Sequence, residues 1–212
     1  MTTGWRDGNL SRRRFLVAMA ATSLLPAPAF AQAVNLDLQA LPAAAGRGDV
    51  YLLRGFADVF SRGLDEMGAE LNSLGVSAHV QGHLTWRSVA RQIIADTKQN
   101  GRVPVVLVGH SLGANAVISI AERLASEGIA VDYMATFAAT APDPVPGNVR
   151  RVVNYYFATN GWGEPLVPGP GFSGSLRNRD FSNSETVGHF NIDKQRPLQA
   201  EVLREVLRTL GR

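Results

Sequence analysis

The segment 109–113 reads Gly-His-Ser-Leu-Gly, which is the G-x-S-x-G spacing of a nucleophile elbow with Ser111 at its centre. An apolar run over 103–108 precedes it and a helical pattern over 114–127 follows, so the serine is expected at the tip of a strand-to-helix turn. A side chain in place of either glycine would press against the neighbouring strand or helix. The spacing favours a nucleophilic serine, and the alternative is an ordinary turn with an incidental serine.

A serine at neutral pH needs a base within hydrogen-bond reach, and the chain has four histidines. His79 and His83 precede the serine, and His110 lies inside the elbow, where it faces the wrong way. His189 follows the last expected strand and precedes the closing helix, so it is predicted to be the base. The alternative for His189 is a helix-capping or surface histidine.

The carboxylate that would orient the base has several candidates. Asp143, flanked by two prolines, follows the strand expected over 131–137 and lies between the serine and the histidine in chain order. It is the favoured acid, although the same residues could form a plain turn. Glu164, after the next expected strand, is the competing acid, and Asp180 is a more distant third.

Two main-chain N–H groups are expected to bind the oxyanion of the reaction. The first belongs to Leu112, the residue after the nucleophile. The second is assigned to Phe56, because the preceding Gly55 lets the backbone approach an oxyanion closely. His83 and Trp86 leave the second expected strand at the same edge, where they either line the substrate pocket or serve only packing and capping.

The expected strands and helices alternate along the chain. Strands are predicted over 49–54, 76–80, 103–108, 131–137 and 151–157, and helices over 61–74, 85–100, 114–127 and 198–210. This alternation predicts an α/β fold with a doubly wound, mostly parallel sheet of about five strands and helices on both faces. The site is then expected beyond the carboxyl ends of the strands, with the Gly/Pro-rich segment 161–174 as a rim of its pocket.

The N-terminus is similar to a twin-arginine export signal. Residues 11–16 read Ser-Arg-Arg-Arg-Phe-Leu, an apolar run covers 17–25, and Ala-Phe-Ala at 29–31 suits a cleavage site. The apolar run is too short to span a bilayer. We expect export of the folded chain to a bacterial periplasm or beyond, with no stable membrane anchor after cleavage. The absence of cysteine excludes a lipoprotein anchor and a disulfide.

The predicted organisation is therefore a signal peptide over 1–31, an irregular leader over 32–48 and one domain over 49–212. The chain has 21 basic and 18 acidic residues, of which four and one fall in 1–31, leaving 17 of each. The mature chain thus has no net charge to attract nucleic acid. It also lacks metal-ligand spacings, a P-loop and a dinucleotide fingerprint, so no cofactor is expected.

Together, the elbow, the strand end 53–56 and the late Gly-His pair at 188–189 resemble the α/β-hydrolase superfamily, in particular its small lipase- and esterase-like members. The resemblance covers 49–210. It implies hydrolysis of a carboxylic ester or thioester through an acyl-enzyme, on a small-molecule or lipid substrate. In that family the acid most often follows the strand after the one that Asp143 follows. The alternative is a degenerate hydrolase fold kept as a binding or scaffolding module.

Overall fold

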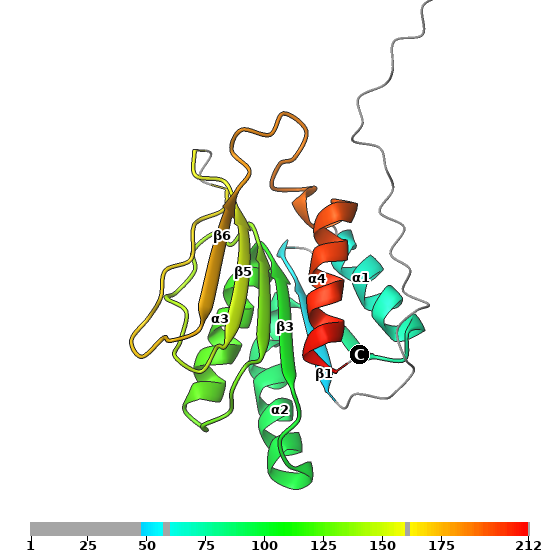
Figure 1. The fold of residues 1–212 in the computed structure, drawn as a ribbon, viewed down its shortest axis with the longest axis vertical. Coiled ribbons are helices and arrows are strands. Elements are labelled where there is room, and N and C mark those ends of the chain that lie inside the picture. The colour runs from blue at the N-terminus through cyan, green and yellow to red at the C-terminus, as the bar shows by residue number, and fades with distance from the viewer. Residues whose placement is uncertain (1–47, 57–59, 160–161, 212) are drawn as a thin grey trace, which may run out of the picture. The chain divides into compact units, whose positions relative to one another are not determined.

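Six parallel strands form one sheet in the order β2-β1-β3-β4-β5-β6 (Figure 1). The computed structural model describes residues 48–56, 60–159 and 162–211. The strands are β1 (Asp49–Arg54), β2 (Ser77–Gly82), β3 (Val105–His110), β4 (Tyr133–Phe137), β5 (Arg151–Tyr156) and β6 (Ser175–Asp180). The helices are α1 (Arg62–Ser73), α2 (Trp86–Asn100), α3 (Leu112–Ala125) and α4 (Arg196–Thr209), with short 3-10 helices η3 (His83–Thr85) and η4 (Ile192–Lys194). The predicted α/β class is confirmed, with one strand more than expected.

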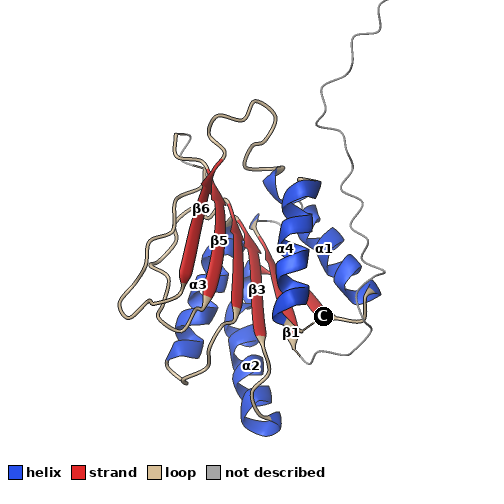
Figure 2. Cartoon of the chain, in the orientation of Figure 1, coloured by secondary structure: helices blue, strands red, loops and turns tan. Residues whose placement is uncertain are grey.

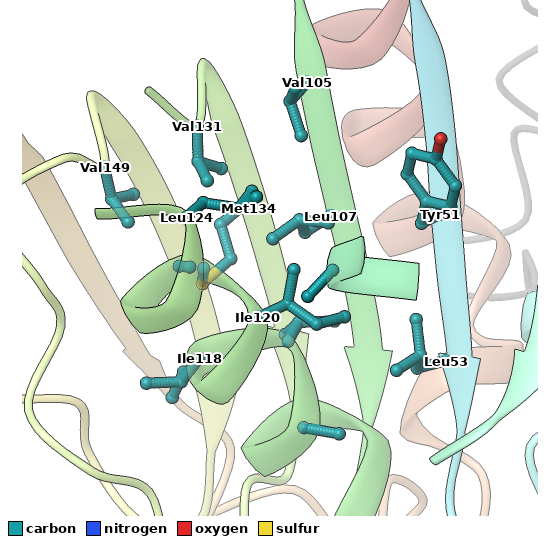
Figure 3. Packing of buried hydrophobic residues seen from close by; sticks show 14 of the residues in the cluster. Tyr51, Leu53, Val105, Leu107, Ile118, Ile120, Leu124, Val131, Met134 and Val149 are labelled. Atoms are coloured by element: carbon teal, nitrogen blue, oxygen red, sulfur yellow. The ribbon is translucent and has the colours of Figure 1, made fainter. Parts of the chain in front are cut away.

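The two faces of the sheet bury alternate side chains of the same strands. Tyr51 and Leu53 of β1 pack with α2 and α3, whereas Val50 and Leu52 pack with α1 and α4. Figure 2 shows the helices on both sides of the sheet, and Figure 3 shows the layer between the sheet and α3. Successive strand side chains point to opposite faces, so a strand covered on both faces is apolar throughout. This is why β1 and β3 are recognisable in the sequence.

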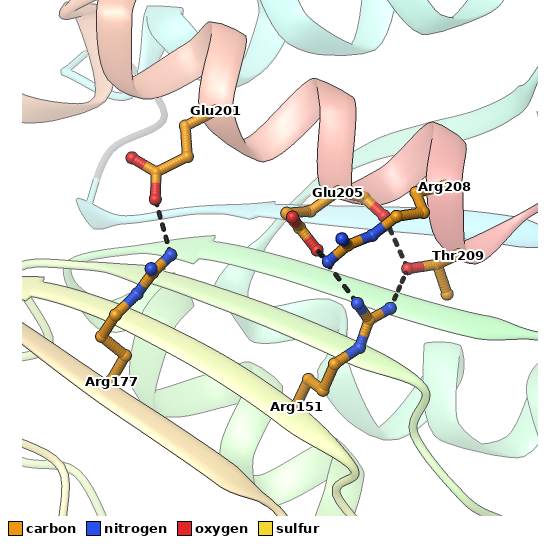
Figure 4. Close-up of polar contacts among 6 residues, drawn as sticks. All are labelled: Arg151, Arg177, Glu201, Glu205, Arg208 and Thr209. Atoms are coloured by element: carbon orange, nitrogen blue, oxygen red, sulfur yellow. Dashed lines mark hydrogen bonds and ion pairs between the residues drawn. The ribbon is translucent and has the colours of Figure 1, made fainter.

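Strand β6, at the edge beside β5, is not among the strands predicted from the sequence. It reads Ser-Leu-Arg-Asn-Arg-Asp, and none of its six residues is buried. Ion pairs join this part of the sheet to α4, with Arg177 of β6 on Glu201 and Arg151 of β5 on Glu205 (Figure 4). Backbone pairing with β5 and these ion pairs hold β6 in place, and its mostly polar side chains give no apolar periodicity that marks it as a strand.

The predicted signal peptide, 1–31, lies outside the described residues, and so does the predicted leader over 32–48 except for Gly48. Within the described ranges, no helix is long and apolar enough to cross a membrane.

Candidate active site

Ser111 occupies a strained turn between β3 and α3. Its φ of 57° and ψ of −123° lie in a region that residues other than glycine rarely adopt. The turn is held from both sides, because the Ser111 N–H donates to the Phe137 carbonyl at 2.8 Å and the Ser111 carbonyl accepts from the Ala114 N–H at 2.9 Å. Backbone strain of this kind persists only where the surroundings impose it. The predicted elbow is therefore present.

The two glycines of the motif have the role predicted for them. A Cβ on Gly109 would overlap the main chain of Gly113 at the start of α3. A Cβ on Gly113 would overlap the carbonyl group of Leu53 in β1. Neither atom could be accommodated without moving backbone, so both positions require glycine to keep Ser111 in its turn.

His189 is in contact with the serine. Its Nε2 lies 3.0 Å from Ser111 Oγ, and its Nδ1 lies 2.6 Å from the main-chain oxygen of Trp162. Because a carbonyl oxygen only accepts, Nδ1 carries the proton and Nε2 is free to accept one from the serine hydroxyl. Burial lowers the pKa of His189 below its ordinary value of 6.5, and the hydrogen bond to the Trp162 carbonyl opposes part of that shift. The imidazole is thus neutral at neutral pH and in the tautomer that a general base needs.

The structure does not bring Asp143 to this histidine. Asp143 is exposed on the loop after β4 and does not line the pocket that holds the serine and the base. Glu164 is also exposed, and Asp180 accepts its hydrogen bonds from the Ala158 N–H and from Ser182. The place of the expected carboxylate is taken by a main-chain carbonyl, which no residue type in the sequence could reveal.

That carbonyl, of Trp162, comes from the loop after β5. This is the loop in which the family resemblance most often puts the acid. Among the described residues, burial and the Trp162 carbonyl are what set the pKa of His189. The base is therefore oriented by a neutral dipole.

The oxyanion side of the site lies against the end of β1. A Cβ on Gly55 would come 2.9 Å from the Ser111 Cβ, so only glycine fits there. The Gly55 N–H donates to Ser61 Oγ at 2.9 Å, so among the residues described next to it the N–H of Phe56 is the candidate donor. Leu112 is the first residue of α3, where the N–H groups have no acceptor within the helix. Both predicted donors, Phe56 and Leu112, line the same pocket as Ser111.

The pocket has a volume of about 370 Å³ and an aromatic mouth. Four side chains there are 45% to 69% exposed, namely Phe56, Phe60, Trp162 and Phe190. The ring centroids of Phe60 and Phe190 lie 5.1 Å apart, and those of Trp162 and Phe190 lie 5.8 Å apart. Among the described residues that line the pocket, none is Asp, Glu, Lys or Arg. We call these four side chains the aromatic rim.

His83 and Trp86, considered for this pocket from the sequence, are not among its lining residues. Nδ1 of His83 lies 3.1 Å from the Gly55 carbonyl oxygen, so it supports the oxyanion loop from behind. Trp86 packs against the core between the sheet and the pair α2 and α3. The predicted rim segment 161–174 contributes Trp162, and beyond it Val167 pairs with the loop after β4. In the described part of the chain, no group of three or more His, Asp or Glu could hold a metal ion.

No protein-family model matches the sequence, and no curated protein matches it. Solved structures do match. The type II thioesterase BorB from the borrelidin biosynthetic cluster has a TM-score of 0.50 and 14% identity, over 77% of this chain and 92% of that one. A cutinase-like protein from Cryptococcus sp. also has a TM-score of 0.50 and 14% identity, over 79% and 97%. The RedJ thioesterase of Streptomyces coelicolor has a TM-score of 0.50 and 13% identity, over 77% and 87%. At these identities the likeness shows the fold, which is α/β-hydrolase-like.

Proposed function

We propose that this chain is a serine hydrolase that cleaves carboxylic esters or thioesters through an acyl-enzyme. The observation that carries the proposal is the 3.0 Å contact between Ser111 Oγ and the unprotonated Nε2 of His189. Ser111 Oγ attacks the substrate carbonyl carbon while its proton passes to Nε2, and the carbonyl electrons move to the oxygen. The N–H groups of Leu112 and Phe56 stabilise that oxyanion. Nε2 then protonates the leaving group, and water releases the acid in a second round.

The Trp162 carbonyl is proposed to replace the carboxylate of a triad. The carbonyl oxygen accepts a hydrogen bond from the Nδ1–H group throughout the reaction. It therefore keeps the imidazole in one tautomer and stabilises the imidazolium that forms. A dipole stabilises that cation less than a full negative charge at the same distance. We therefore expect a slower enzyme than a hydrolase with a complete triad.

The lining of the pocket supports an uncharged substrate. Burial of an acyl or alcohol chain against its apolar walls is favourable, and among the described residues that line it there is no charged side chain to pair with a phosphate or carboxylate. The aromatic rim extends the apolar surface outward from Ser111. Esters with apolar groups of several carbons are thus the proposed substrates.

The decisive experiment is labelling with a fluorophosphonate probe, followed by turnover of p-nitrophenyl esters of increasing chain length. The wild type should be labelled on Ser111, as located by mass spectrometry. Ser111→Ala should lose the label and about a thousandfold or more of the turnover while it stays folded. If the wild type is neither labelled nor active on any ester, the chain is a degenerate hydrolase fold with a binding or scaffolding role.

Export by the twin-arginine machinery is a separate proposal that depends on the sequence of residues 11–31. Replacement of both Arg12 and Arg13 by lysine should leave the precursor in the cytoplasm of a bacterial host, whereas the unchanged chain should reach the periplasm. Fractionation with an antibody against the domain measures this directly. Equal export of both forms would refute it.

A further inference from the structure

His110 directly precedes the nucleophile but has no part in the reaction proposed above. Its side chain is turned into the protein, with 1% of its surface exposed. Nδ1 lies 2.8 Å from Ser61 Oγ, and Nε2 lies 2.8 Å from the main-chain oxygen of His189. One imidazole thus contacts two segments that are 128 residues apart in the chain.

The direction of each hydrogen bond follows from the groups present. The His189 carbonyl can only accept, so Nε2 of His110 carries the proton. Nδ1 is then an acceptor, and the Ser61 hydroxyl donates to it. Ser61 Oγ in turn accepts from the Gly55 N–H at 2.9 Å. The result is a continuous chain of three hydrogen bonds from the oxyanion loop to the base, in which every donor meets an acceptor.

Burial lowers the pKa of His110 to about 4, so the ring stays neutral where the proposed reaction works. This matters because the rings of His110 and His189 lie 5.2 Å apart. A second cation at that distance would oppose formation of the imidazolium on His189. A neutral His110 binds both loops without that electrostatic cost.

We propose that His110 is a positioning residue that holds the oxyanion loop and the loop of the base in register across Ser111. The proposal rests on the function proposed above. The loop after β1 supplies Phe56, and the segment before η4 supplies His189, so the two halves of the site reach Ser111 from different parts of the chain. A shift of about 1 Å between such groups can cost on the order of a hundredfold in rate.

Two substitutions of His110 separate the two halves of this link. Asn can present an oxygen near the position of Nδ1 but does not reach the His189 carbonyl, whereas Gln can present its N–H near the position of Nε2. We expect His110→Asn to lower kcat about ten- to a hundredfold per labelled active site, with KM changed less than about threefold. It should also change the pH at which the acid limb falls, because the His189 carbonyl loses its hydrogen bond from the side chain at position 110. His110→Gln should restore the acid limb.

Ser61→Ala removes the hydroxyl that joins His110 Nδ1 to the Gly55 N–H. It should lower kcat without changing the pH of the acid limb. His79→Asn is the matched control and should behave like the wild type. His79 lies on β2 and contacts Ser77, Asp49 and the ring of Tyr51, none of which lines the pocket. Normalisation to fluorophosphonate-labelled sites removes the effect of unfolded protein. A merely structural role would lower the midpoint of thermal unfolding while kcat per labelled site and the acid limb stayed unchanged, and that result would overturn the proposal.

NMR of imidazole nitrogens tests the link without any turnover. The His110 ring should show a protonated Nε2 and an unprotonated Nδ1, with no titration above about pH 5. Titration near 6.5, or a proton on Nδ1, would overturn the positioning role even in an active enzyme. A wild type that is neither labelled nor active would instead refute the proposed function, and the positioning role with it.

Discussion

Substitution of Asp143 by Asn distinguishes an acid at that position from orientation of the base by the Trp162 carbonyl. Where a carboxylate holds the imidazole of a serine hydrolase, the change to the amide lowers kcat on the order of 10⁴-fold, or about 5 kcal/mol. Here Asp143 is exposed, and Nδ1 of His189 donates its hydrogen bond to a carbonyl oxygen 2.6 Å away. We therefore expect Asp143→Asn to change kcat by less than about threefold, under about 1 kcal/mol.

The assay is kcat for a short p-nitrophenyl ester, normalised to the fraction of Ser111 that a fluorophosphonate labels. Glu164→Gln and Asp180→Asn are measured beside Asp143→Asn, since each removes one carboxylate and keeps its shape. All three should stay near the wild-type rate. A loss of a hundredfold or more in any folded variant would identify that carboxylate as the orienting acid and refute the assignment to the carbonyl.

Three further outcomes are expected. The acid limb of kcat/KM should lie below pH 6.5, because the base must be neutral and burial lowers the pKa of His189. Activity is then full above that pKa and is lost as the pH falls through it. An acid limb at pH 7 or above would contradict this. Gly55→Ala should lower kcat at least about tenfold, because the added Cβ would come 2.9 Å from the Cβ of Ser111. Gly188→Ala is the control and should keep most of the activity, because a Cβ there meets nothing within 4 Å. Phe190→Ser should raise KM for long-chain esters more than for short-chain esters. Leu84→Ser removes an exposed apolar side chain outside the pocket and should raise neither KM value. Equal effects of the two substitutions on KM would refute a role of the aromatic rim in binding the apolar group of the ester.

The sequence by itself determined the features that depend on local spacing. The elbow is recognisable because a strand, a tight turn flanked by two glycines and a helix must follow each other within a few residues around Ser111. Strands β1 and β3 are covered on both faces, so their central residues are apolar and visible as runs. His189 was predicted from its place between the last strand and the closing helix, and the structure brings it to the serine.

Tertiary structure alone decided the partners that meet across long stretches of chain. The group on Nδ1 of His189 is a main-chain carbonyl, and every residue has one, so residue type cannot indicate it. The strand β6 is polar because it lies at an edge and pairs its charges with α4, so its sequence has no apolar period. His110 contacts two partners that lie 49 and 79 residues away in the chain, and its position next to Ser111 in the sequence indicates neither of them. Such contacts depend on how the loops converge at one edge of the sheet, and the composition of no single segment specifies that convergence.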